Sequence, residues 1–110
     1  MLDVQAALRA AGVPGYRAGF RRGAEERMPE QYAVYSVKRA EEDYWDDAPH
    51  AVTLAPALAL YSRANPAALA AAVEAAMRAE GFSLIDRAET YDKLADLYAV
   101  ESRWTGEAAL

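Results

Sequence analysis

Two stretches of the chain decide its fold, QYAVYSVK at residues 31–38 and HAVTLAPALALYS at residues 50–62. Both carry the β-branched and aromatic residues that are enriched in strands. Side chains alternate along a strand, so the first stretch would present two faces. These are Tyr32, Val34 and Ser36 on one side, and Ala33, Tyr35 and Val37 on the other.

The second stretch has the same alternation, with Leu54, Leu58 and Leu60 on one face. Pro56 interrupts it and has no N–H to donate, which predicts a sheet edge or a bulge at that residue. The intervening residues 41–47, EEDYWDD, are interpreted as an acidic loop. The two strands can therefore pair antiparallel across this loop.

Residues 66–80 form the clearest predicted helix, PAALAAAVEAAMRAE. Asn65 suits the N-cap, Pro66 suits the first turn, and Gly81 is a typical residue beyond a helix C-terminus. Within it, Leu69, Val73 and Met77 recur every four residues and predict a buried stripe. Glu74 and Arg78 have the spacing of a helical ion pair.

The remaining segments complete an α+β fold. Residues 3–11 read as a short helix capped by Asp3 and stopped by Gly12, and a short strand is expected at 16–20 before a charged loop through Met28. Residues 82–87 and 95–104 read as strands, with TGEAAL at 105–110 frayed. The prediction is one domain over residues 1–110. It is an antiparallel or mixed four-stranded sheet, covered on one face by a long helix at 66–80 and a short N-terminal helix at 3–11.

Composition narrows the possible functions. The chain has 110 residues, 12 basic and 17 acidic side chains, one histidine and no cysteine. The missing thiols exclude zinc ribbons, iron–sulfur sites, cysteine nucleophiles and disulfides. No stretch approaches the roughly 18 apolar residues of a membrane span, and residues 1–10 lack the pattern of a signal peptide.

The charge is distributed unevenly. Residues 13–39 carry six basic and three acidic groups, whereas residues 40–50 carry five acidic groups and no base. An acidic protein is a poor general binder of polyanions. Opposite charges on separate segments suit head-to-tail association of identical copies, and a merely solvated surface is the alternative.

Candidate catalytic and metal-binding residues are weak. His50 is expected to be an ordinary residue at a strand start, because no second histidine or suitably placed serine accompanies it. The acidic loop could offer oxygens to a hard cation, or a carboxylate pair from Asp43 and Asp46 or Asp47, but it lacks the spacing of a calcium loop. We therefore expect no catalytic residue, metal or cofactor.

A binding surface is the stronger prediction. Tyr44 and Trp45 lie among charges and would either fold back on the sheet or anchor an interface. Four arginines would form a patch that faces a partner by salt bridges rather than nucleic acid. The candidate interface residues are Asp43, Tyr44, Trp45, Asp46, Asp47, Arg17, Arg21, Arg22 and Arg27.

The order of motifs resembles a family of small neck proteins, the tail-terminator or tail-completion proteins of long-tailed phages and prophages. The resemblance runs from about residue 31 to 104, through QYAVYSV, DYWDD, ALALYSR, NPAALAAAVEAAMRAEGF and AETYDKLADLYAVESRW. The matching positions are Tyr32, Tyr35, Asp46, Asp47, Leu60, Tyr61, Gly81, Phe82, Glu89, Thr90 and Tyr91. Pro56 and the glycine- and arginine-rich insert at 15–27 depart from the family pattern.

The resemblance implies a non-enzymatic virion protein, assembled in the bacterial host cytoplasm. Such proteins form a ring, usually of six copies, that caps the tail tube and meets the head connector or stopper protein. DNA would only pass through the lumen. A head-closure or minor tail component is the alternative within this class. An alternative of another class is a small-ligand or accessory module with a ferredoxin-like fold, which an apolar pocket beneath the helix would favour.

Overall fold

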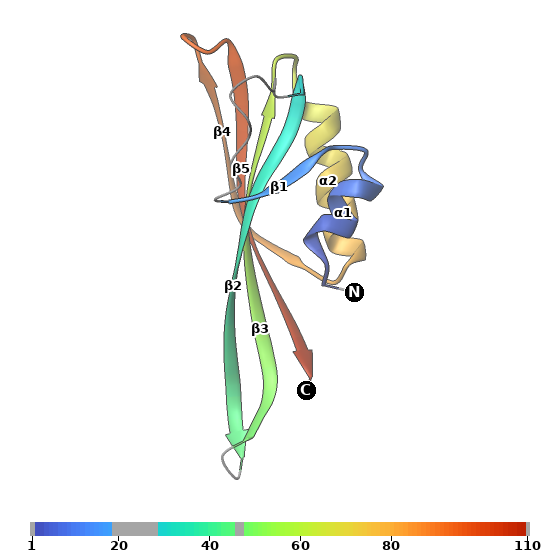
Figure 1. Ribbon diagram of the computed structural model, residues 1–110, viewed down its shortest axis with the longest axis vertical. Coiled ribbons are helices and arrows are strands. Elements are labelled where there is room, and N and C mark those ends of the chain that lie inside the picture. Colours follow the sequence, from blue (N-terminus) through green and yellow to red (C-terminus); the bar gives the residue numbers. More distant parts are fainter. Residues whose placement is uncertain (1, 19–28, 46–47, 110) are drawn as a thin grey trace.

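The computed structural model describes residues 2–18, 29–45 and 48–109, and the side chains of 2–18, 29–40 and 51–108. Its elements are α1 (Val4–Ala10), β1 (Gly15–Arg17), β2 (Gln31–Trp45), β3 (Ala48–Ser62), α2 (Ala67–Ala79), β4 (Ser83–Asp92) and β5 (Leu97–Ala109). The five strands form one sheet in the order β1-β2-β3-β5-β4. β1 runs parallel to β2 and all other neighbours are antiparallel. Both helices lie on the same face of this sheet (Figure 1).

The predicted four-stranded sheet beneath a long helix is wrong. The sheet has five strands and is mixed, and the two helices have only 7 and 13 residues. Most of the described chain is strand, because β2, β3 and β5 are each 13 to 15 residues long. The α2 helix therefore covers only part of one face, and the β2–β3 hairpin extends well beyond it (Figure 1).

Strands β2 and β5 are longer than the sequence predicts, which explains part of the wrong fold prediction. Residues 41–45 do not form a loop, since β2 continues through them and pairs with β3 as far as Trp45 opposite Ala48. The segment 105–109 is not frayed, because it pairs with β3 up to Ala109 opposite Ala51. Strands at the edge of a sheet tolerate charged side chains. The acidic residues at 41–43 were therefore not sufficient evidence for a loop.

Pro56 occupies a central strand, so the predicted edge or bulge at that residue is wrong. β3 lies between β2 and β5, and Pro56 is opposite Val37 of β2. The pairing with β5 stops at Leu54–Gly106 and resumes at Ala57–Arg103 in the same register. This gap in the pairing with β5 includes Pro56, which has no backbone N–H to donate. The irregularity of register lies instead in β4, between Leu84 and Asp86.

The core fills the space between the helices and the sheet. Val73 and Met77 of α2 are buried as predicted, and Leu69 is half-buried against them. Trp104 of β5 is fully buried, and its indole N–H donates to the Ser102 hydroxyl at 2.8 Å. These contacts confirm the stripe of α2 as core.

The predicted ion pair within α2 does not form. The Glu74 carboxylate instead accepts from Arg87 of β4 at 2.9 Å. The Arg78 guanidinium lies 5.9 Å from the centroid of the Trp104 ring, at cation–π distance. Both side chains therefore bind the helix to the sheet instead of supporting the helix by itself.

Glycine ends both helices as the sequence predicts. Gly81 has φ +101°, its N–H donates to the Arg78 carbonyl, and the N–H of Phe82 donates to the Met77 carbonyl. Gly12 has φ +77° and closes α1 with the same pair of bonds. This is the Schellman arrangement, which needs a residue in the left-handed region. The Asn65 side chain accepts from the Ala67 N–H at 3.0 Å, although α2 begins one residue later than predicted.

Replacing Gly81 by alanine should destabilise the fold by about 1 kcal/mol. The cause is the positive φ, and the added Cβ would also stand 3.3 Å from Leu2 Cδ2. Urea denaturation followed by circular dichroism measures the loss. Gly81→Asn is the matched variant and should lose less, because asparagine tolerates this conformation better. Equal losses in the two variants would contradict the explanation by backbone conformation.

Candidate functional site

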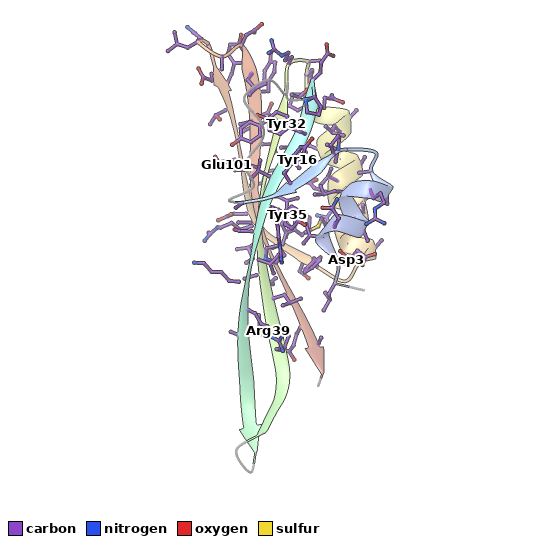
Figure 2. The ribbon with its side chains drawn as sticks, in the orientation of Figure 1. Asp3, Tyr16, Tyr32, Tyr35, Arg39 and Glu101 are labelled. Atoms are coloured by element: carbon purple, nitrogen blue, oxygen red, sulfur yellow. The ribbon has the colours of Figure 1, made fainter. Side chains whose placement is uncertain are left out.

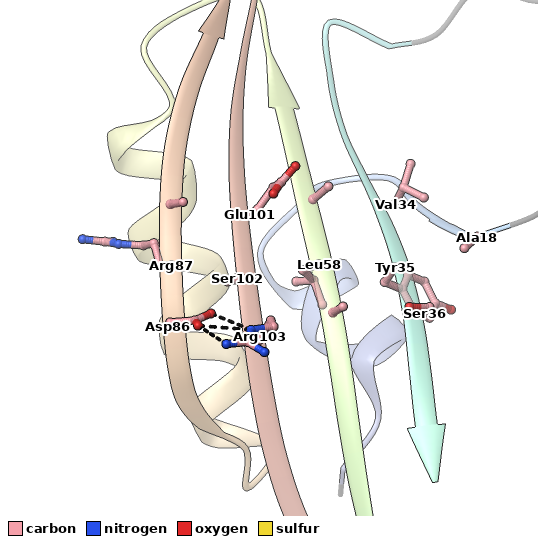
Figure 3. Close-up of a pocket in the computed structure, with 13 residues that line it drawn as sticks. Ala18, Val34, Tyr35, Ser36, Leu58, Asp86, Arg87, Glu101, Ser102 and Arg103 are labelled. Atoms are coloured by element: carbon pink, nitrogen blue, oxygen red, sulfur yellow. Dashed lines mark hydrogen bonds and ion pairs between the residues drawn. The ribbon is translucent and has the colours of Figure 1, made fainter.

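The sheet face turned away from the helices carries an open groove of about 490 Å³ (Figure 3). Register places its residues in two rows across the strands. One row consists of Val34, Ala59, Glu101 and Ala88, and the other of Ser36, Ala57, Arg103 and Asp86. The floor is therefore small and mainly apolar, with charged residues gathered over β4 and β5.

The alternation in β3 creates this floor. Leu58 and Leu60 are buried on the helix side, whereas Ala57 and Ala59 point to the opposite face. Because the alanine side chains are short, they leave a depression between the longer side chains on either side. The sequence contains this signal in the stretch ALALY at 57–61, where the sequence analysis used the leucines and Tyr61 but not the alanines.

Tyrosines lie on the same face of the sheet, one row beyond Val34 and Ala59. Tyr32 and Tyr61 lie directly opposite each other on β2 and β3, with ring centroids 5.0 Å apart in a stacked arrangement. Tyr16 of β1 meets the Tyr32 ring edge-on at 6.4 Å (Figure 2). Such cross-strand aromatic pairs stabilise the sheet beside the groove.

An ion pair lies in the second row of the groove. Arg103 of β5 donates to both carboxylate oxygens of Asp86 on β4, with Nε 2.9 Å from Oδ1 and 3.1 Å from Oδ2. This hydrogen bonding lowers the pKa of Asp86 and raises the pKa of Arg103. Glu101 has no ion-pair or hydrogen-bond partner among the described residues, and it lies on the side of the sheet away from the helices (Figure 2).

The Asp86 carboxyl should titrate below its ordinary value of 3.8. The pKa of Asp86 is lower in the folded state than in the unfolded state. The ion pair therefore stabilises the fold at any pH above the unfolded-state pKa, and this stabilisation is lost as the pH falls through the folded-state pKa. Carboxyl NMR titration measures the midpoint directly. In Arg103→Gln the midpoint should rise toward the ordinary value, and an unchanged midpoint in that variant would refute the pairing as its cause.

The structure locates only part of the predicted interface. Asp43, Tyr44 and Trp45 are the last residues of β2, and only their backbone is described. Arg17 is the exposed last residue of β1, opposite Tyr35. Tyr35 is ten residues from Trp45, about 33 Å along an extended strand, so Arg17 and the hairpin end lie far apart. Asp46, Asp47, Arg21, Arg22 and Arg27 lie outside the described residues.

Other kinds of site have little support in the described residues. His50 lies in β3, where only its backbone is described. Among the side chains that the structure describes, in 2–18, 29–40 and 51–108, no three histidine or acidic residues are grouped as a metal site would need. Neither α1 nor α2 is long and apolar enough to cross a membrane.

The fold has a similar counterpart among solved structures. The match is a chain in a structure described as "Virion of native gene transfer agent (GTA) particle", with a TM-score of 0.56 and 13% sequence identity. The similarity covers 94% of this chain and 84% of that chain. No protein-family model matches the chain, and no curated protein matches it. At this identity the comparison shows a shared fold.

Proposed function

We propose that this chain is a structural virion protein of a phage-like particle, which caps the tail tube as a ring and joins it to the head connector. The observation that carries the proposal is the shared fold with a chain of a gene transfer agent virion, which extends over nearly the whole length of both chains. The motif order of a tail terminator or tail-completion protein supports the same class. The role is structural and not catalytic.

The shape of the molecule supports an assembling protein. The chain measures 53 × 29 × 23 Å, so a large share of its surface is available to neighbours. Within the described residues, β1 pairs only with residues 33–35 of β2, and the rest of that strand edge is open. β4 is the opposite edge of the same sheet. Open edges and an uncovered face are surfaces through which sheets contact other chains.

The proposed partners are further copies of this chain, the tail tube protein and the connector or stopper protein. A ring of six copies is the state expected from the resemblance, with DNA passing through its lumen. The hairpin end at 43–47 and the arginines at 17, 21, 22 and 27 remain the proposed contact residues. A head-closure or minor tail role is the alternative within the class.

A small-ligand module is the alternative of another class. The feature that would favour it is an apolar pocket beneath the helix. The groove described above lies on the other face of the sheet, is open, and carries charged side chains. This position fits a contact with a macromolecule better than enclosure of a small molecule.

Deleting the coding sequence in the cell that produces the particle tests the proposal, with electron microscopy of the products. Loss of a terminator should give tail tubes of unregulated length that do not join heads. Loss of a head-closure protein should give tails of normal length beside heads that have lost their DNA. Particles of normal shape and number would refute a neck role, and complementation with the intact chain is the control.

A further inference from the structure

We draw no further inference here: the strongest candidate, the open groove over Ala57 and Ala59 on the sheet face turned away from the helices, carries none because nothing among the described residues shows what covers it.

Discussion

Trp104→Ala should destabilise the protein by about 3–5 kcal/mol, the largest loss expected of any single truncation. The indole is fully buried, donates to Ser102 and lies beneath the Arg78 guanidinium. Truncation would leave a cavity at the junction of α2 and β5, and would also remove the cation–π contact. Since a domain of this size has a total stability of about 5–15 kcal/mol, the variant should be largely unfolded at moderate temperature.

Chemical denaturation monitored by circular dichroism measures this loss. Leu94→Ala is the matched control, because it truncates a large apolar side chain that is fully exposed. Its free energy of unfolding should stay within about 0.5 kcal/mol of the native chain. Similar losses for the two variants would contradict the placement of Trp104 in the core.

Leu8→Ala should destabilise the protein by about 2–5 kcal/mol. Leu8 is fully buried, and its Cδ1 stands 2.5 Å from where a Cβ on Gly15 would lie, so it fills the space that the glycine leaves. The α1 helix has seven residues and would not persist alone, since short helices depend on packing. Loss of this side chain should therefore free α1 and the adjoining β1 strand.

Hydrogen exchange distinguishes this local effect from a general one. In Leu8→Ala, protection should fall most in residues 4–17 and least in the paired centre of β3 and β5. Arg9→Ala is the control, because Arg9 is exposed on the same helix. Uniform loss of protection over the whole sheet would show that α1 is not a separable unit of the fold.

Local signals predicted the helices well, for identifiable reasons. Gly12 and Gly81 end α1 and α2 because each occupies the left-handed region that a Schellman motif requires. The four-residue spacing of Val73 and Met77 predicted their burial. The alternation in residues 32–37 separated the two faces of β2, and the structure shows that the face with Ala33 and Tyr35 is the buried one. These features depend on neighbours in the sequence, so sequence alone carries them.

Pairing between distant segments was harder to predict. The acidic residues after Ala40 read as a loop, yet β3 provides partners for them and extends the hairpin. Thr105 to Ala109 became strand for the same reason, with β3 again as the partner. Pro56 entered a central strand because its missing N–H falls where the ladder to β5 is interrupted. Each of these outcomes depends on a partner strand that local propensity does not reveal.

The candidate site was predicted only in its general character. Sequence reasoning expected a binding surface and placed it at the hairpin end and the arginine segment. The groove arises from cross-strand neighbours, such as Ala59 beside Glu101, that lie 42 positions apart in the chain. Its one local signal is the alternation of alanine with leucine in β3.

Native mass spectrometry of the full chain, over a series of protein and salt concentrations, tests the central claim most directly. The account predicts closed assemblies of more than two copies, weakened by salt and free of bound small molecules. A monomer at every concentration would contradict head-to-tail assembly. A monomer that retains the mass of a small molecule or metal would favour a ligand-binding module instead.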